Sequence, residues 1–222
     1  MFFNPFTVLI FFLFLAVFFV LLFFVQIGAL TVAFSKIGIS PHYMLTLFFL
    51  TLVGSAINIP IKRFVEDELC DERVIPFYGM RYRLPVPQQP CTTTLAVNVG
   101  GAVIPVLISL YILFKCQVPF RALLATGFMS VVVFKLARPI RGVGIGVPVL
   151  VPPLLAALIA LILSPANAPP VAYISGTLGT LVGADLMNLK KITGLGAPVA
   201  SIGGAGTFDG IFLTGIIAVL LT

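Results

Sequence analysis

Two acidic residues stand apart from the rest because each lies in an apolar stretch near the end of the chain. Asp185 lies within "TLVGADLMNLKK" and Asp209 within "GGAGTFDGIFLTG". The other acids share one polar stretch: Glu66, Asp67, Glu68, Asp71 and Glu72. An ionised carboxylate inside a bilayer costs about 2.5–3.5 kcal/mol on insertion scales, so an acid in an apolar segment marks a candidate functional site.

A pair of aspartates has a chemistry of its own, the hydrolysis of a peptide bond. On a helix, Asp185 would lie about 7–8 Å below the cytoplasmic boundary that Lys190 and Lys191 mark, and Asp209 begins the next apolar segment from the same side. Two carboxyls at matched depth on consecutive antiparallel helices can meet, and they would then share one proton. One carboxylate takes a proton from the attacking water, while the protonated partner hydrogen-bonds the peptide carbonyl and later protonates the leaving nitrogen.

Residues near the two aspartates could support this chemistry. Thr207 could hydrogen-bond the Asp209 carboxyl, and Gly206 and Gly210 would admit an unwound substrate backbone. Asn98 could orient the catalytic water if it reached the aspartates. A hydrogen bond between helices is the preferred interpretation of Asn98 as of Asn58.

The composition predicts that these residues lie in a membrane. Hydrophobic residues make up 60% of the 222 residues and charged residues 9%, with a mean hydropathy of +1.19. Soluble domains carry about 25% charged residues, and apolar stretches of about 20 residues recur along this chain. We therefore expect an all-α polytopic membrane protein, a single integral domain over residues 1–222, in the cell (inner) membrane of a prokaryote.

The apolar stretches predict about seven transmembrane helices. They cover residues 6–34, 43–61, 93–114, 120–134, 147–163, 171–189 and 208–221. Six or eight spans stay open as alternatives, because two stretches are short and Pro148, Pro152 and Pro153 could kink the fifth. Most Lys and Arg residues fall in alternate loops, so the positive-inside rule places these loops and the amino terminus in the cytoplasm.

The longest of these cytoplasmic loops, residues 62–92, contains the pattern of a β-hairpin. In "RVIPFYGMRYRLPVP", residues 73–87, apolar residues alternate with Arg around Gly79, while Pro76 and Pro85 favour an edge position. An exposed edge could bind a peptide substrate strand around Tyr78, Gly79 and Arg81. Contact of this stretch with lipid headgroups is an equally good interpretation.

Other chemistries are not indicated by the residue types. Cys70, Cys91 and Cys116 show no metal-ligand spacing and no disulfide framework, and His42 is the single histidine. We therefore expect no metal and no cofactor. The net charge of +6 is spread over several loops, which favours anionic lipid over nucleic acid. The expected partners are the lipid bilayer and a membrane-embedded peptide or protein substrate.

The two aspartate motifs resemble those of the GxGD-type intramembrane aspartyl proteases, the presenilin and signal peptide peptidase class. "GTFDG" on the last predicted span and "GAD" on the one before carry the likeness, which implies that Asp185 and Asp209 are the catalytic pair near the cytoplasmic side. Phe208 stands where that motif has its second Gly, and no Pro-Ala-Leu follows. Through "NVGGAVIP" and "GGAGTFDGIFLTG" the chain is also similar to prokaryotic multi-pass membrane proteins of no assigned function.

Intramembrane aspartyl proteolysis is the predicted function, and a transporter or channel is the first alternative. In that alternative the aspartates would gather with Asn58, Asn98 and Asn188 as oxygen ligands or as a proton relay. The Gly-interrupted segments "VNVGGAVIP" and "SIGGAGTFDG" are of the kind that exposes backbone carbonyls to an ion.

A non-catalytic membrane scaffold is the second alternative. Asp209 would then cap the start of its helix and complement the helix dipole. Asp185 would pair with Lys190 or Lys191, whose side chains are long enough to reach along the membrane boundary. Neither role needs the two carboxyls to meet.

Overall fold

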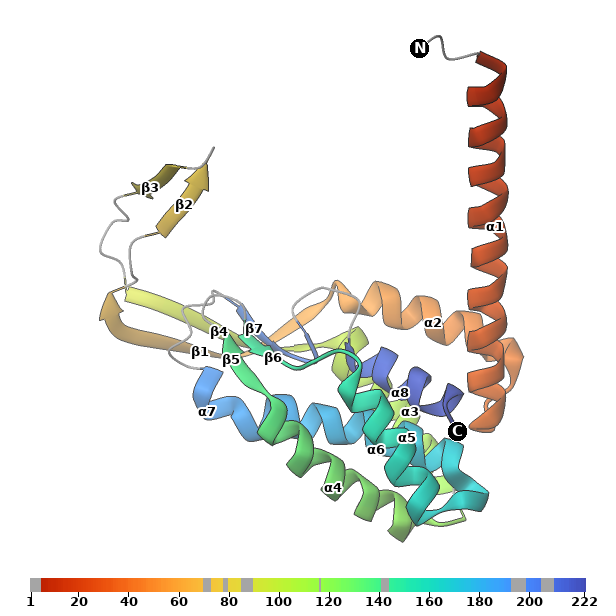
Figure 1. Ribbon diagram of the computed structural model, residues 1–222. Coiled ribbons are helices and arrows are strands. Elements are labelled where there is room, and N and C mark those ends of the chain that lie inside the picture. Colours follow the sequence, from red (N-terminus) through yellow and green to blue (C-terminus); the bar gives the residue numbers. More distant parts are fainter. Residues whose placement is uncertain are drawn as a thin grey trace.

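The computed structural model describes residues 5–69, 73–77, 80–84, 90–115, 117–140, 144–192, 199–204 and 210–222. The protein is mostly helical, and small sheets lie at one end of the helices (Figure 1). The α-helices are α1 (Pro5–Lys36), α2 (Pro41–Ser55), α3 (Ile104–Lys115), α4 (Pro119–Leu136), α5 (Val151–Leu163), α6 (Ala168–Thr180), α7 (Leu189–Ile192) and α8 (Gly210–Leu220). Short π-helices η1 (Val99–Val103) and η3 (Leu181–Asp185) and 3₁₀-helices η2 (Pro165–Asn167) and η4 (Leu186–Asn188) adjoin them.

Two of the helices in the described residues are long and apolar enough to cross a membrane, Phe11–Lys36 within α1 and the whole of α4. The other apolar helices are shorter, between 11 and 17 residues where η1 is counted with α3. Prolines lie in the first turn of α2, α4, α5 and α6, where the missing N–H has no helical partner to lose. Pro152 and Pro153 therefore start α5 and do not kink it.

The second and third predicted spans are helical over only part of their length. Helix α2 ends at Ser55, and the rest of the second stretch belongs to strand β1 (Asn58–Leu69). The third stretch begins as strand β4 (Pro90–Asn98) before it becomes η1 and α3. The run "TTTLAVN" explains the difference, since Thr and Val are typical of strands and a short apolar run does not distinguish strand from helix.

Strands β1 and β4 form a long antiparallel ribbon in the place of the predicted loop at residues 62–92. Asn58 pairs with Asn98 at the end nearest the helices. Strand β7 (Val199–Ile202) then pairs in parallel with β4, from Thr94 opposite Val199 to Val97 opposite Ile202. The order β1-β4-β7 places the segment before Asp209 beside the segment before α3.

The predicted hairpin is confirmed at the far end of this ribbon. Strand β2 (Arg73–Phe77) pairs antiparallel with β3 (Met80–Leu84), and Phe77 lies opposite Met80. Figure 1 shows the hairpin well away from the helices. A further short pair, β5 (Arg138–Ile140) with β6 (Gly144–Gly146), joins α4 to α5.

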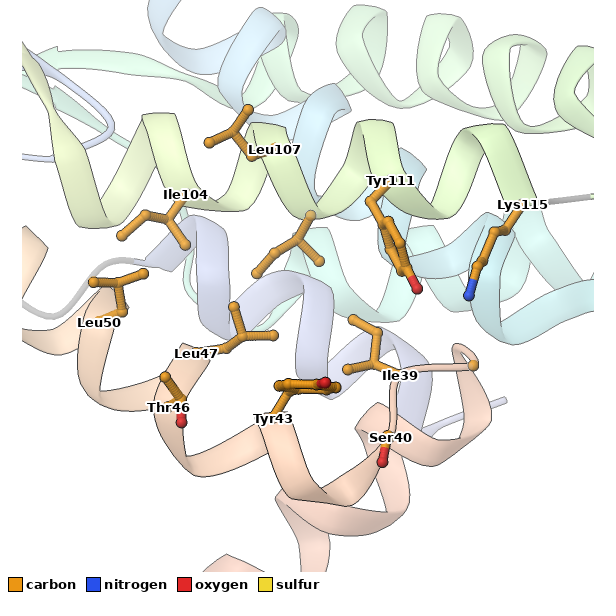
Figure 2. A pocket seen from close by; sticks show the side chains of 12 residues that line it. Ile39, Ser40, Tyr43, Thr46, Leu47, Leu50, Ile104, Leu107, Tyr111 and Lys115 are labelled. Carbon is orange, nitrogen blue, oxygen red and sulfur yellow. The ribbon is translucent and has the colours of Figure 1, made fainter.

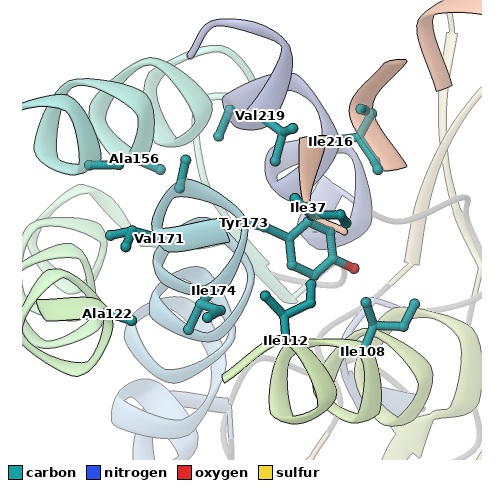
Figure 3. Close-up of a cluster of buried hydrophobic side chains, with 14 of the residues drawn as sticks. Ile37, Ile108, Ile112, Ala122, Ala156, Val171, Tyr173, Ile174, Ile216 and Val219 are labelled. Carbon is teal, nitrogen blue, oxygen red and sulfur yellow. The ribbon is translucent and has the colours of Figure 1, made fainter. Parts of the chain in front are cut away.

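Helix α6 lies at the centre of the helical bundle and contacts α3, α4, α5 and α8. Its Tyr173 and Ile174 are fully buried, between Ile112 of α3 and Val219 of α8 among others (Figure 3). Glycines on one side let α4 approach. A Cβ atom at Gly179 would lie 2.6 Å from the Cβ of Met129, so only Gly fits this contact.

Helix α1 contacts the bundle only near its carboxyl end. Ala33 and Phe34 are fully buried, whereas Phe14 is 72% exposed, and Figure 1 shows α1 running across the direction of the bundle helices. The outward side of the bundle is apolar as well, with Phe114 87% and Phe120 73% exposed. Apolar surface of this extent is unusual on a soluble monomer and is typical of contact with lipid or another protein.

Candidate functional site

Asp185 lies where the central helix stops being regular. The π-helix η3 ends at Asp185, and the 3₁₀-helix η4 follows it directly. The buried side chain of Asn188 stabilises this irregular turn, because its Nδ2 donates to the backbone oxygens of Gly183 and Ala184, both at 3.0 Å. π-turns within helices occur often at functional sites, since they move side chains out of helical register.

The Asp185 carboxylate binds the first part of the glycine-rich motif. Its Oδ2 accepts a hydrogen bond from the backbone N–H of Gly203 at 2.7 Å. Gly203 and Gly204 have φ angles of +87° and +89°, a conformation that glycine adopts without a steric penalty. A Cβ at Gly203 would lie 2.6 Å from the backbone nitrogen of Ala102, so this turn is also packed against η1.

A cavity of about 440 Å³ opens beside this carboxylate. Its lining comes from η3, β7, the segment from β6 to α5 and the first turns of α8. Gly204 and Gly210, which flank Asp209 in the sequence, both line the same cavity as Asp185. Asp209 itself lies outside the described residues, as do Gly206 and Thr207.

Three hydroxyl groups that sequence reasoning missed also line this cavity, those of Thr180, Ser201 and Thr214. The Oγ1 atom of Thr180 is buried and has no hydrogen-bond partner within the described part of the chain. The Thr214 hydroxyl donates to the backbone oxygen of Gly210 at 2.6 Å. Thr180 and Asp185 are five residues apart, which is the spacing of one π-turn. The sequence alone does not indicate that a π-turn occurs here, so this spacing could not be used to predict Thr180.

Asn98, predicted as a supporting residue, has structural contacts. It is 1% exposed and caps η1, since its Oδ1 accepts from the Gly101 N–H at 2.7 Å. Its Nδ2 donates to the Ser55 backbone oxygen at 2.6 Å and to Asn58 Oδ1 at 3.0 Å. The prediction of hydrogen bonds between helices is wrong in its elements, because Asn98 ends strand β4 and Asn58 begins strand β1. Asn98 joins this strand end to the last residue of α2. Asn98 is not among the residues that line the cavity.

Asn98 is connected to the edge of the cavity through Asn58 and Ser201. Asn58 Oδ1 accepts a second hydrogen bond, from the Ser201 hydroxyl at 2.6 Å, and Ser201 lines the cavity. Asn98 and Asn58 thus hydrogen-bond to each other. Asn188 instead donates to backbone oxygens of its own helical turn. Among the described residues, the Asp185 carboxylate accepts a hydrogen bond from the Gly203 N–H.

Gly210 begins α8 and lines the cavity. Lys191 lies over the ring of Phe134, 4.8 Å from its centroid. Tyr78 and Gly79 lie outside the described residues, and strand β3 places Arg81 opposite Pro76. No group of three or more His, Cys, Asp or Glu that could hold a metal occurs among the described residues.

Fold and site together define a mostly helical protein in which a bundle and a small sheet enclose a cavity around an aspartate. The family described as "Protein of unknown function (DUF1614)" matches residues 52–221, which is more than half of the chain, and the chain belongs to this family. Asp185, the cavity and the β1-β4-β7 sheet all lie in the matched region, whereas α1 precedes it. No curated protein and no solved structure matches the chain.

Proposed function

We propose that this protein is an intramembrane aspartyl protease in which Asp185 and Asp209 form the catalytic pair. The observation that carries the proposal is that Asp185, Gly204 and Gly210 line one cavity. Residue 209 is bonded to Gly210, so their Cα atoms are about 3.8 Å apart. This covalent connection supports the proposal that the second carboxylate reaches the cavity that Asp185 lines.

The proposal includes a multi-pass position in the cell (inner) membrane, with the amino terminus in the cytoplasm. Support comes from the apolar outward side of the bundle and from the two helices that are long enough to cross. Helix α5 has 13 residues and measures about 20 Å, less than a hydrocarbon core of about 30 Å. Helices of this length span a membrane that is locally thinned, or together with their flanking segments.

In the proposed reaction, one carboxylate accepts a proton from water as the water oxygen attacks the carbonyl carbon of the substrate. The protonated partner donates a hydrogen bond to the carbonyl oxygen, and the carbon–nitrogen bond breaks as the leaving nitrogen is protonated. The Gly203 N–H holds Oδ2 of Asp185 in a defined place during these steps. The cavity has room for water and for a short stretch of peptide backbone.

The sheet suggests how such a substrate binds. In the order β1-β4-β7, strand β7 pairs with β4 along one side and leaves its other side unpaired among the described strands. Ala200 and Ser201 of β7 line the cavity with Asp185. An extended peptide that adds to β7 would be held by main-chain hydrogen bonds and would pass the Asp185 carboxylate.

The test is cleavage of a panel of labelled single-span peptides by the purified protein in detergent, with products identified by mass spectrometry. Asp185→Asn and Asp209→Asn are compared with wild type, and Asp67→Asn provides the same chemical change away from the cavity. We expect each active-site variant to lower the rate by at least about 100-fold, since general acid–base groups contribute about 10²–10⁴-fold. Asp67→Asn should cleave at the wild-type rate.

Each variant should remain folded, because an Asn at position 185 can still accept the Gly203 hydrogen bond. Thermal unfolding in detergent checks this point. Equal cleavage by wild type and both active-site variants would identify a contaminant as the protease. Failure of wild type to cleave any peptide, together with an Asp185-dependent ion or proton flux in vesicles, would replace proteolysis by transport.

A further inference from the structure

A second cavity lies between α2 and α3 and shares no lining residue with the cavity at Asp185. Its volume is about 630 Å³, within the usual range of about 300–1,000 Å³ for small-molecule sites. Leu47, Leu50 and Ile104 line one end of it (Figure 2). Apart from Thr46, which lies beside Leu47, the labelled side chains at this end are apolar.

The other end of the cavity is polar and positively charged. Figure 2 shows the amine of Lys115 and the hydroxyl of Tyr111 at the same end, with Tyr43 and Ser40 on the α2 side. The Nζ atom of Lys115 lies 4.7 Å from the centroid of the Tyr111 ring. Among the described residues no carboxylate pairs with Lys115, so its charge is available to an anion.

We propose that this cavity binds an anionic phospholipid, with one acyl chain between α2 and α3 and the phosphate at Lys115, Tyr43 and Tyr111. The order of groups along the cavity matches the order in such a lipid: a cation and hydroxyls first, then an apolar channel. Lysine and tyrosine are the side chains that occur at the membrane–water boundary, where the long lysine stem lets the amine reach the headgroup level.

Lys115 is the last residue of α3, and Lys36 is the last residue of α1. The predicted topology places both helix ends at the membrane face opposite the cytoplasm. With the topology proposed above, the bound lipid belongs to the leaflet on that side. A helix from a second copy of the chain is a poorer occupant, because it would cover Lys115 with apolar side chains and leave a charge without a partner. A phosphate group supplies that partner.

The test measures lipid binding to the purified, delipidated protein by native mass spectrometry. Phosphatidylglycerol and phosphatidylcholine with identical acyl chains are titrated, so that the two differ only in headgroup charge. We expect wild type to bind phosphatidylglycerol at least about tenfold more tightly, a difference of about 1.4 kcal/mol. Lys115→Gln should remove this preference, and Lys36→Gln, a matched loss of charge outside the cavity, should keep it.

A second variant tests the acyl-chain part of the site. Leu50→Trp places a larger side chain in the apolar end and should lower the binding of both lipids, while thermal unfolding shows that the protein remains folded. Equal binding of the two lipids by wild type would overturn the proposal, as would an equal loss of preference in Lys36→Gln. A dimer that Leu50→Trp dissociates would also overturn it, because a second copy would then occupy the cavity.

Discussion

The segment after β4 and the segment after β7 begin alike and end differently. Both follow neighbouring parallel strands, both contain adjacent glycines, and both lead to an apolar helix, α3 in one case and α8 in the other. After β4, the Asn98 side chain caps the next turn through the Gly101 N–H. After β7, the Gly203 N–H binds a carboxylate from a different element, Asp185 of η3.

The difference separates a packing junction from a candidate site. At the first junction the polar atoms of Asn98 are paired, and the backbone at Gly100 contacts α2 directly. At the second junction a cavity remains, and the hydroxyl of Thr180 beside it has no partner among the described residues. Buried polar groups without partners are uncommon in folded proteins and often mark places where water or a ligand binds.

Gly100→Ala should cause the largest loss of stability. The new Cβ would meet the Thr51 backbone oxygen and the Ser55 backbone nitrogen, which cannot move without shifting α2. We expect the free energy of unfolding to fall by about 3 kcal/mol or more, at the upper end of overpacking effects. Denaturant unfolding in detergent, followed by circular dichroism, measures this change.

Gly127→Ala is the control for that substitution. Gly127 lies within α4, and apart from the backbone of its own helix no atom lies within 4 Å of its added Cβ, so alanine should stabilise the helix by up to about 1 kcal/mol. An equal effect of the two substitutions would contradict the close contact between Gly100 and α2.

Gly203→Ala should damage the second junction. Alanine at a left-handed φ costs about 1–2 kcal/mol, and the contact with Ala102 adds to this cost. Gly38→Ala provides the comparison, because Gly38 has a φ of +78° but open space around its Cβ. The difference in unfolding free energy between the two variants isolates the contact with η1, and a difference near zero would contradict it.

Asn98→Ala should have a smaller effect, because it removes a cap and two donated hydrogen bonds without adding bulk. Loss of a cap costs about 0.5–2 kcal/mol, and an unpaired buried acceptor adds about 1 kcal/mol or more. We expect a total of about 2 kcal/mol by the same unfolding measurement. A loss below about 0.5 kcal/mol would mean that water replaces the Asn98 side chain at no cost.

Thr180→Val should have the smallest effect on stability. The hydroxyl it removes has no hydrogen-bond partner among the described residues, so the change should lie within about 0.5 kcal/mol or be stabilising. Thr51→Val removes a hydroxyl that donates to the Leu47 backbone oxygen at 2.8 Å and should cost about 0.5–1.5 kcal/mol. If Thr180→Val proves the more costly of the two, the Thr180 hydroxyl has a partner, such as bound water.

Much of the fold follows from local signals in the sequence. The long apolar runs predict α1 and α4, and the alternation around Gly79 predicts the β2–β3 hairpin. Strands β1 and β4 could not be predicted in the same way, because "TTTLAVN" continues without interruption into the apolar residues of α3. Their pairing depends on contacts between residues far apart in the chain, such as Asn58 with Asn98.

The sequence predicted that Asp185 belongs to a candidate site, but it did not predict which groups surround Asp185. Asp185 stands out because an acid is costly in an apolar segment. Its bond to Gly203 depends on the π-turn and on the parallel pairing of β7 with β4, and neither has a local sequence pattern. Asn98 illustrates the reverse case, a polar residue that the motif suggested for the site and that the fold uses as a cap.

The distance between positions 185 and 209 tests the central claim most directly. In a chain whose cysteines are replaced by serine, Asp185→Cys and Asp209→Cys are combined and treated with a short bifunctional thiol reagent. Asp185→Cys with Thr222→Cys, at the far end of α8, serves as the control pair. Carboxyls that share a proton lie within about 4–6 Å, so we predict a single bridging reagent in the intact mass of the first pair only. Two separate reagents on the first pair, as on the control, would contradict the account.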